Sequence, residues 1–366
     1  MKIMTILGTR PEIIRLSLLI KKLDKYCDHV LVHTGQNFDD SLSSIFFSDL
    51  DLREPDYYLG IIGDSFSEQI GKIIIEAEKV ILKEKPDRVL ILGDTNSGLA
   101  AIVAKRMGIP VFHMEAGNRC FDDRVPEEVN RRIIDHSSTI LLPYTYRSKE
   151  NLLKEGIARE AIYVIGNPIY EVIEHYSKEI ENSEILDKLN VQPKKYFLVT
   201  MHRAENVDDK DRLKNLLIGL DEINKKYTFP VICSLHPRSK SKIEQFKLKI
   251  TNNNLHFSTP FGFFDFIALE KNALCVITDS GTVQEECCIL KVPNITIRDV
   301  TERPETIESG SNMLASISPN LMLKSVEVVL NEKCKWEPPR EYLERDVSSK
   351  VVKIILGYLR NTVGSR

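Results

Sequence analysis

Apolar residues along the chain gather in short runs, and a longer stretch with helical spacing follows most of them. The pattern begins with an apolar run at 2–8, a helical stretch at 11–25 and a second apolar run at 29–35. Short apolar runs that alternate with helices are typical of parallel strands joined by crossover helices. The pattern therefore predicts an α/β fold with a doubly wound parallel sheet. Further strands are predicted at 88–92, 111–114, 140–142 and 162–165, and a further helix at 99–107.

A polar stretch at 176–195 interrupts this alternation. An interruption of this kind marks a domain boundary, so two Rossmann-like lobes are expected. The last stretch, 341–360, has a helical pattern and is expected to pack back on the first lobe. The predicted division is 1–170 for the first lobe, 171–345 for the second and 346–366 for the terminal helix. Strands of the second lobe are predicted at 196–201, 231–235, 274–278 and 294–297.

Composition and charge limit the partners of such a protein. The chain has 366 residues, 42% of them apolar, and a formal net charge of −3. Charges of both signs are mixed and form no basic stripe, which argues against nucleic acid as a partner. No segment is apolar over a length that crosses a bilayer, and the N-terminus lacks a signal-peptide pattern. We therefore expect a cytoplasmic protein without a membrane partner.

The cysteines indicate neither a disulfide framework nor a zinc site. There are seven of them, and no two have the C-x-x-C spacing. An odd set without this spacing is typical of reduced thiols. We expect Cys287 and Cys288 to pack inside a helix, and we expect no metal.

In the first half, acidic residues directly follow two of the predicted strands. Asp94 comes after 88–92, Glu115 comes after 111–114, and Glu127 lies twelve residues beyond Glu115. Open α/β sheets bind ligands at the carboxyl ends of their strands, so these acids are expected at a ligand site. Any one of them alone is more often a helix cap or a surface residue, whereas several together favour catalysis.

In the second half, the segment 275–286 predicts a strand, a tight turn at Ser280 and Gly281, and the start of a helix. Backbone N–H groups at a helix N-terminus, beside a glycine that permits close approach, can bind a phosphate. Glu286 lies about one and a half turns into the helix, where it can accept hydrogen bonds from a ribose. Ordinary capping by Asp279 or Ser280 explains the segment equally well.

A related turn opens the first predicted helix with the sequence Gly-Thr-Arg-Pro-Glu at 8–12. Arg10 supplies a guanidinium that can hold a diphosphate by two hydrogen bonds. The turn is not G-x-G-x-x-G, and the next strand end lacks the acid that binds a ribose in dinucleotide folds, which disfavours NAD. His202 and His236 follow two strands of the second half. Polar strand ends in both halves predict a site in a cleft between the lobes.

With these motifs together, the chain resembles the non-hydrolysing UDP-N-acetylglucosamine 2-epimerases, whose two-lobed fold is that of GT-B glycosyltransferases. The resemblance extends over almost the full chain in family order. It is carried by LGTRPEIIRL (7–16), HTGQNFD (33–39), GDTNS (93–97), HMEAG (113–117), PEEVNRR (126–132), MHRAEN (201–206), SLHPR (234–238), PFGFFDFIAL (260–269), DSGTVQEE (279–286) and RDVTERPE (298–305).

The resemblance implies inversion at C2 of a UDP-2-acetamido sugar for surface polysaccharide such as capsule or O-antigen. UDP is eliminated to leave a glycal and is then added back, with the proton delivered to the other face. It also implies a homodimer that needs no cofactor. Asp94 and Glu115 form the expected core pair, and which acid takes the first proton stays open. The implied catalytic residues are Asp94, Glu115, Glu127 and His202; the implied UDP contacts are Arg10, His236, Phe261, Ser280, Gly281 and Glu286; further substrate contacts are Arg131 and Arg203.

Two segments depart from the common family pattern. The loop 118–125 replaces a slightly longer one, and Asn37 stands where the family often has histidine. Both changes resemble the subgroup that converts UDP-2-acetamido-2,6-dideoxy-L-talose to UDP-N-acetyl-L-fucosamine. Some bacterial members bind a second UDP-N-acetylglucosamine as an activator through the segment around position 37, and that regulation is left open here.

Other activities compete with this interpretation. A hydrolysing 2-epimerase that releases N-acetylmannosamine shares the elimination step and differs only in the escape of the intermediate. A GT-B glycosyltransferase shares the fold and the UDP site, but it does not explain Asp94, Glu115 and Glu127 together. A nucleotide-sugar binding protein without turnover would tolerate loss of these acids, and all three are present.

Overall fold

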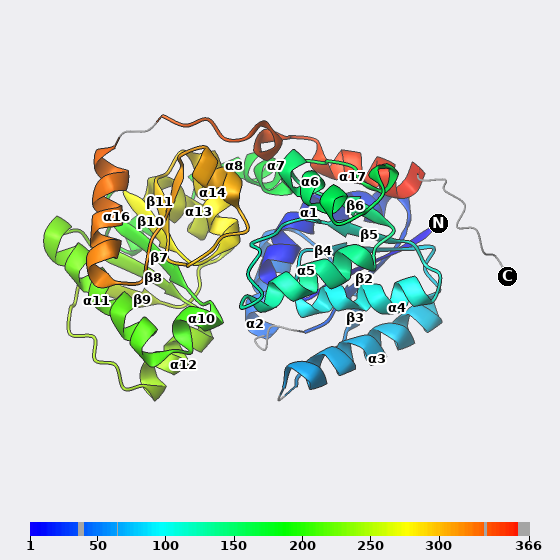
Figure 1. Cartoon of the computed structure of the whole chain (residues 1–366), viewed down its shortest axis with the longest axis horizontal. Helices are drawn as coiled ribbons and strands as arrows, with labels where there is room; N and C mark the ends of the chain where they lie inside the picture. The colour runs from blue at the N-terminus through cyan, green and yellow to red at the C-terminus, as the bar shows by residue number, and fades with distance from the viewer. Residues whose placement is uncertain (36–39, 64, 333–334, 358–366) are drawn as a thin grey trace. The chain divides into compact units, whose positions relative to one another are not determined.

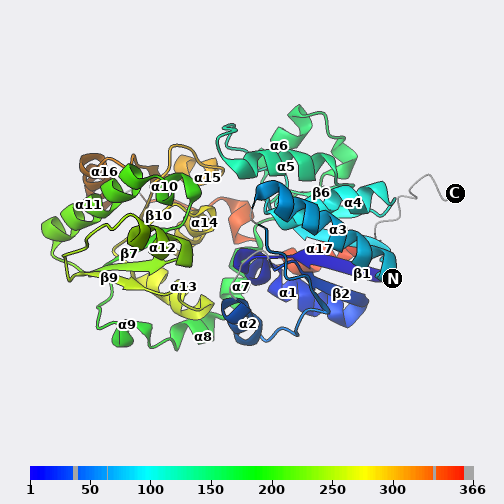
Figure 2. The same cartoon turned by 90° about the horizontal axis from the view of Figure 1, so that it is seen from below.

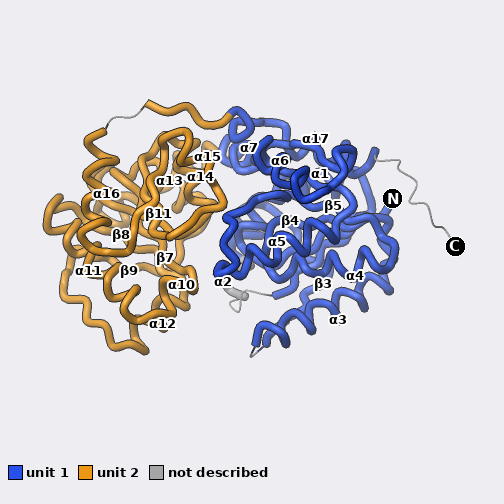
Figure 3. Tube along the Cα trace, in the orientation of Figure 1, with its two compact units in different colours: residues 1–175, 340–366 blue, residues 176–339 orange. Residues whose placement is uncertain are grey.

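The computed structural model describes residues 1–35, 40–63, 65–332 and 335–357, and the chain divides into two compact units (Figures 1 and 3). The first unit comprises residues 1–175 and 340–366, and the second comprises 176–339. In the part of the chain that the structure describes, each unit contains one six-stranded parallel sheet flanked by helices. The predicted α/β fold with two Rossmann-like lobes is confirmed. We refer to the units as the first and second lobes.

The first sheet has the strand order β3-β2-β1-β4-β5-β6, with parallel pairing between neighbours. The chain runs outward from β1 to β3 and then returns to place β4 on the other side of β1. Such a reversal opens a crevice at the carboxyl ends of the two central strands, where α/β proteins bind ligands. The strands are β1 Lys2–Leu7, β2 Asp28–His33, β3 Tyr57–Tyr58, β4 Arg88–Leu92, β5 Val111–Met114 and β6 Ile140–Leu142.

Helices cover both faces of this sheet (Figure 2). α3, α4 and α5 lie over one face, and α1 and α17 lie over the other. The central strands are buried on both sides as a result, which explains their uninterrupted apolar sequence. The helical segments are α1 Arg10–Tyr26, α2 Asp40–Asp49, α3 Phe66–Glu84, η1 Asn96–Leu99, α4 Ala100–Arg106, α5 Pro126–His136, α6 Tyr146–Lys154, η2 Arg159–Ala161, α7 Pro168–His175, η3 Arg340–Leu343 and α17 Val347–Gly357.

The second sheet repeats this topology with the order β12-β11-β10-β7-β8-β9. Its reversal lies between β7 and β10, so the carboxyl ends of these two strands form the second crevice of this kind. The strands are β7 Phe197–Met201, β8 Val231–Leu235, β9 Leu255–Ser258, β10 Cys275–Thr278, β11 Asn294–Thr296 and β12 Asn312–Leu314.

Helices also cover both faces of the second sheet, with α11 and α16 on one face and α13 on the other (Figure 2). Cys287 and Cys288 are fully buried in α14, and the six described cysteines are free thiols, while Cys334 lies outside the described residues. The helices are α8 Ser177–Glu181, α9 Ile185–Lys188, α10 Ala204–Val207, α11 Lys210–Tyr227, α12 Pro237–Gln245, α13 Phe263–Asn272, α14 Gly281–Leu290, α15 Pro304–Glu308 and α16 Pro319–Asn331.

The strand predicted at 162–165 is wrong. Only Ile162 forms an isolated bridge, to Leu141. Tyr163 donates a backbone hydrogen bond to Leu141 in β6, and Ile165 donates one to Pro143 just after β6. The segment cannot extend because Gly166 has a left-handed φ of +91° and Pro168 begins α7. Conversely, the edge strands β3, β9 and β12 were not predicted.

The C-terminal helix α17 packs on α1 in the first lobe. Val351 and Ile355 are fully buried there, and Lys22 of α1 donates to the hydroxyl of Ser348 over 2.7 Å. The predicted helix at 341–360 is thus a 3₁₀ turn followed by α17, and residues 358–360 lie outside the described part. Among the described residues, no helix is long and apolar enough to cross a membrane.

Candidate active site

Asp94 and Glu115 lie at the carboxyl ends of the neighbouring strands β4 and β5. Leu92 pairs with Met114 in the register of these strands, so the two acids follow adjacent positions. Each acid sits on a turn with left-handed backbone: φ is +78° at Gly93 and +66° at Glu115. A left-handed φ is uncommon for a residue other than glycine and points to a constrained position.

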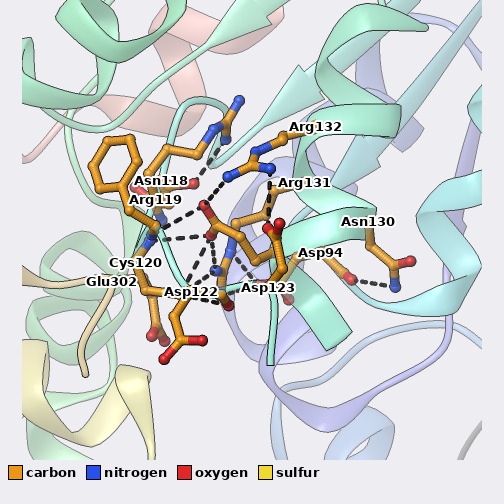
Figure 4. A network of polar contacts seen from close by, with 12 residues as sticks. Asp94, Asn118, Arg119, Cys120, Asp122, Asp123, Asn130, Arg131, Arg132 and Glu302 are labelled. Atoms are coloured by element: carbon orange, nitrogen blue, oxygen red, sulfur yellow. Dashed lines mark hydrogen bonds and ion pairs between the residues drawn. The ribbon is translucent and has the colours of Figure 1, made fainter. Parts of the chain in front are cut away.

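A buried arginine from a helix holds each of these carboxylates. Arg131 of α5 donates from Nε to Asp94 Oδ2 over 2.8 Å, as Figure 4 shows. Arg15 of α1 donates to Glu115 Oε2 over 2.7 Å, and Asn118 contacts the other oxygen at 3.4 Å. Charged hydrogen bonds of this kind favour the ionised carboxylate, which is the form that can accept a proton.

Glu127 and Glu128 in the first turn of α5 have different surroundings. Glu127 is half-buried. Glu128 is fully buried, pairs with Arg131 at 2.7 Å and accepts from the backbone N–H groups of Cys120 and Phe121. Glu128 therefore fixes the loop 118–125 and shares Arg131 with Asp94. This leaves Glu127 as the more accessible acid of the two.

Glu12 fills the anion position in the turn between β1 and α1. Its carboxylate accepts from the backbone N–H groups of Gly8 and Thr9, at 2.6 and 2.7 Å, and from the hydroxyl of Thr95 at 2.7 Å. Burial raises the pKa of Glu12 to about 7, although these hydrogen bonds act in the opposite direction. A ligand phosphate therefore does not find these two backbone donors vacant, and Arg10 is the group of this turn that can bind it.

Arg10 is partly buried, and burial lowers the pKa of its guanidinium. The guanidinium lies over the ring of Phe46, 5.6 Å from its centre. No carboxylate within ion-pair distance of Arg10 occurs among the described residues. A cation in these surroundings suits an anionic ligand.

In the second lobe, Asp279 after β10 organises the end of β7. Its buried carboxylate accepts from the backbone N–H groups of His202 and Arg203 at 2.9 and 3.0 Å, and from the side chain of Asn206. Nδ1 of His202 lies 3.2 Å from the same carboxylate, while 40% of the His202 side chain is exposed. Asp279 thus fixes the orientation of a histidine that stays accessible to a ligand.

The first turn of α14 has no side-chain cap. Ser280 is the N-cap residue, and its hydroxyl lies 3.0 Å from the Thr282 hydroxyl rather than on a backbone N–H. Asp279 is turned toward β7 and does not cap either. A side chain at Gly281 would place Cβ 2.4 Å from Glu302 Oε1, so the carboxylate of Glu302 would have to move. Of the two interpretations of this segment, capping is therefore the weaker, and phosphate binding stays a prediction.

Glu286, 7% exposed in α14, has the fully buried Glu270 of α13 as a neighbour. Burial, together with the charge of Glu286 and a hydrogen bond between the two carboxyl groups, raises the pKa of Glu270 well above its ordinary value. The two carboxyl groups therefore influence each other's ionisation.

The other predicted contacts of the second lobe lie near these groups. Arg203 reaches Glu302 at 3.7 Å, and Glu302 is held by Arg298 at 2.7 Å. His236 is the N-cap of α12 and its ring centre is 6.3 Å from that of His202. Phe261 is half-buried in the loop between β9 and α13.

Sequence reasoning did not single out Arg15 or Glu12, and it considered Asp279 only as a helix cap; all three hold the predicted groups in place. Their signals were present: Arg15 follows Arg10 by five residues, on a helix that begins at the central crevice, and Asp279 directly follows a buried strand. Asn37 lies outside the described residues. Among those described, no cluster of three or more His, Cys, Asp or Glu side chains is arranged to hold a metal ion.

The sequence comparisons and the structure comparison point to the same protein family. Over residues 21–356 the chain matches the family described as UDP-N-acetylglucosamine 2-epimerase. It is 47% identical over 348 residues to "UDP-N-acetylglucosamine 2-epimerase" of Methanocaldococcus jannaschii, covering 93% of this chain and 95% of the relative. It is 37% identical to "UDP-2,3-diacetamido-2,3-dideoxy-D-glucuronate 2-epimerase" of Pseudomonas aeruginosa, covering 91% and 93%.

A solved structure of the Methanocaldococcus jannaschii UDP-GlcNAc 2-epimerase, in complex with UDP-GlcNAc and UDP, superposes with a TM-score of 0.93. It is 45% identical and covers 98% of this chain and 100% of that one. The class is an enzyme of the GT-B architecture. It is defined by two Rossmann-like lobes, with acids at the strand ends of one lobe and a helix that begins at Gly281 in the other. Within that class, the chain belongs to the UDP-N-acetylglucosamine 2-epimerase family and is an isomerase.

Proposed function

We propose that this protein inverts C2 of a UDP-2-acetamido sugar, with Asp94 and Glu115 as the central proton-transfer groups. The observation that carries the proposal is the pair of arginine-held carboxylates on adjacent strand ends. The C2 proton of such a sugar is only weakly acidic. A base that stays ionised and is fixed by its neighbours lowers the barrier to its removal.

The reaction breaks the C2–H bond and the C1–O bond of the sugar. The site must accept the proton from C2 and the negative charge that develops on UDP. One carboxylate takes the proton from C2, the C1–O bond to UDP breaks, and a C1=C2 double bond forms. Re-addition joins a phosphate oxygen of UDP to C1 and returns a proton to the opposite face of C2. Two acids, one for each face, satisfy this proton balance. Glu127 and His202 are the further candidates for these roles.

Departure of UDP places negative charge on its diphosphate. The uncapped first turn of α14 with Ser280 and Gly281 supports a role in binding this charge, and Arg10 supplies a cation without a carboxylate partner among the described residues. Glu286 suits the ribose hydroxyls, because its carboxylate lies in the helix that the proposed diphosphate site opens and can accept hydrogen bonds from them. His236 and Phe261 complete the proposed UDP contacts, and Arg131 and Arg203 the sugar contacts.

UDP-N-acetylglucosamine is the substrate that the relatives favour, since two solved family members carry it as a bound ligand. The loop 118–125 favours a second candidate, UDP-2-acetamido-2,6-dideoxy-L-talose. Glu128 and Arg119 fix this loop, and Phe121 at its tip is 72% exposed with a φ of +56°. An apolar ring suits a C6 methyl group better than a hydroxymethyl group.

The test is incubation with each UDP-sugar in D₂O, followed by NMR of the sugar. We expect deuterium at C2 of an epimer with one of the two substrates. No exchange with either one contradicts the epimerase proposal. Release of free sugar together with UDP favours the hydrolysing reaction, and transfer to an added acceptor favours a glycosyltransferase. The homodimer, the cytoplasmic location and the role in capsule or O-antigen synthesis stay predictions.

A further inference from the structure

A buried histidine and a buried aspartate are hydrogen-bonded to the turns that carry the two proposed catalytic acids. His113 is in β5, two residues before Glu115, and Asp135 is near the end of α5. Each is only 1% exposed. The proposed reaction uses neither side chain, and buried charged groups are costly unless they serve a purpose.

Each ring nitrogen of His113 has a hydrogen-bond partner. Nε2 of His113 lies 2.8 Å from the carbonyl oxygen of Gly93, and Nδ1 lies 2.8 Å from Asp135 Oδ1. A carbonyl oxygen only accepts, so Nε2 donates to Gly93. An ionised carboxylate also only accepts, so Nδ1 donates as well. The ring therefore links the Gly93 turn to Asp135 through its two nitrogens.

Asp135 is held in its ionised form by more than His113. Its second oxygen accepts from the backbone N–H of Gly117 at 3.1 Å and from the guanidinium of Arg119 at 2.7 Å. Burial raises the pKa of Asp135, but the hydrogen bonds and charges of His113 and Arg119 outweigh burial and keep this pKa below its ordinary value. The carboxylate therefore ties three parts of the chain to one point.

One hydrogen bond of His113 and one of Asp135 reach the turns that carry the acids. Gly93 directly precedes Asp94, and Gly117 comes two residues after Glu115. Both turns have left-handed backbone, including the non-glycine Glu115, and Gly117 cannot accept a side chain because Cβ would lie 2.3 Å from the carbonyl of Ser148. Backbone of this kind persists only where surrounding contacts enforce it.

We propose that His113 and Asp135 are positioning residues that lock the Gly93 and Gly117 turns and thereby set the places of Asp94 and Glu115. The proposal rests on the proposed function for the roles of those two acids. Misplacement of a proton-transfer group by about 1 Å costs on the order of 100-fold in rate, while the proposed UDP contacts Arg10, Ser280 and Gly281 are left unchanged. Loss of the pair should therefore lower kcat and leave KM nearly unchanged.

A second histidine–aspartate pair in the same lobe provides a matched control. His29 in β2 contacts Asp24 at 2.6 Å through Nδ1 and the hydroxyl of Thr5 at 2.8 Å through Nε2, and its side chain is 1% exposed. This pair lies at the amino end of its strand, away from the turns that carry the acids. Its loss removes a histidine–aspartate contact of similar length, with the aspartate 29% exposed, without loosening those turns.

The experiment compares H113N, D135A, D135N and H29N. We expect H113N and D135A to lose about 100-fold in kcat, with KM changed less than about threefold. D135N keeps an oxygen acceptor and can donate to a neutral His113, so it should retain activity within about tenfold of wild type. H29N should lose thermal stability and keep its kcat.

Amide hydrogen exchange supplies a readout that does not depend on the reaction. Peptides that span Gly93 and Gly117 should exchange faster in H113N than in wild type, and at the wild-type rate in H29N. Unchanged exchange in H113N overturns the proposal, and so does an H29N variant that loses as much kcat as H113N. A wild-type enzyme without C2 exchange would refute the proposed function, whereas the exchange data would still decide the role of His113.

Discussion

The guanidinium of Arg15 lies 2.7 Å from a carboxylate oxygen of Glu115, and the two side chains are 1% and 9% exposed. The pair joins the first helix of the chain to the end of β5, a hundred residues further on. Arg15 also lies over the ring of Tyr144, at 5.6 Å. Because both side chains are buried, water cannot readily solvate one of them if the other is removed.

Replacement of Arg15 by methionine should therefore destabilise the protein strongly. It leaves Glu115 buried without its cation, and breaking a buried pair in this way costs about 3–5 kcal/mol. Urea unfolding at neutral pH measures the change. R53M is the control, because Arg53 pairs with Asp24 and Asp56 at the surface and such pairs contribute at most about 1 kcal/mol. Equal losses in the two variants would mean that burial of the Arg15 pair has no energetic consequence.

Glu12 should make stability depend on pH between about 4.5 and about 7. Its pKa is raised to about 7 in the folded state, from 4.5 in the unfolded chain. The unfolded chain therefore releases this proton first, and the folded state loses relative stability as pH rises through that window. The full effect is about 3 kcal/mol.

E12Q should lack this loss, because the amide keeps an oxygen for the Gly8 and Thr9 N–H groups but does not titrate. Urea unfolding of both proteins at pH 4.5, 6 and 8 gives the comparison. E76Q, at an exposed position that pairs with Lys79, should follow wild type. Parallel curves for wild type and E12Q would show that Glu12 is already ionised in the folded protein at low pH.

Replacement of Glu270 by methionine should stabilise the second lobe. Glu270 is fully buried, burial raises its pKa well above the ordinary value, and it has no cation as a partner among the described residues. An apolar side chain of similar length removes the cost of burying this carboxyl group, which is about 1–3 kcal/mol.

Glu285→Met provides the opposite case in the neighbouring helix, because it breaks the buried ion pair with Arg303 at 2.5 Å. Thermal unfolding at pH 8 should show a higher Tm for E270M and a lower Tm for E285M. A lower Tm for E270M would instead assign Glu270 a structural role through its contact with Glu286.

Gly281→Ala should weaken UDP binding at least tenfold. The added Cβ meets Glu302 and displaces it from the first turn of α14, where we propose that the diphosphate binds. Calorimetric titration with UDP measures the Kd. Gly71→Ala in α3 is the control, since nothing lies within 4 Å of its Cβ, and it should raise stability by about 0.5–1 kcal/mol with the Kd unchanged. Unaltered binding by G281A would exclude this turn from the UDP site.

The pattern of apolar runs predicted the buried strands well because these strands are covered on both faces. β4 and β7 lie within one residue of their predicted bounds for this reason. The edge strand β3 has two residues, and β9 is half-exposed, so neither has an apolar run to recognise. Strands of this kind are defined by their pairing with a neighbour, which a single segment of sequence does not contain.

The acids of the site were recognisable from their position, but their partners were not. Asp94 and Glu115 follow apolar strands, and this local signal is visible in the sequence. Arg15 contacts Glu115 across a hundred positions, and no local pattern connects them. The difference between Glu127 and Glu128 also depends on the fold, because it arises from which side of α5 faces the loop 118–125.

The packing of α17 on α1 also fixes an order of events during synthesis. The helix α17 is synthesised after the other described helices and covers the first one, so the first lobe cannot be completed until residues 347–357 have been made. The second lobe is one continuous segment and has all of its strands earlier. During synthesis the second lobe is therefore complete while the apolar surface of α1 is still exposed, because α17 has not yet been made. This exposed surface is the one that a chaperone would bind.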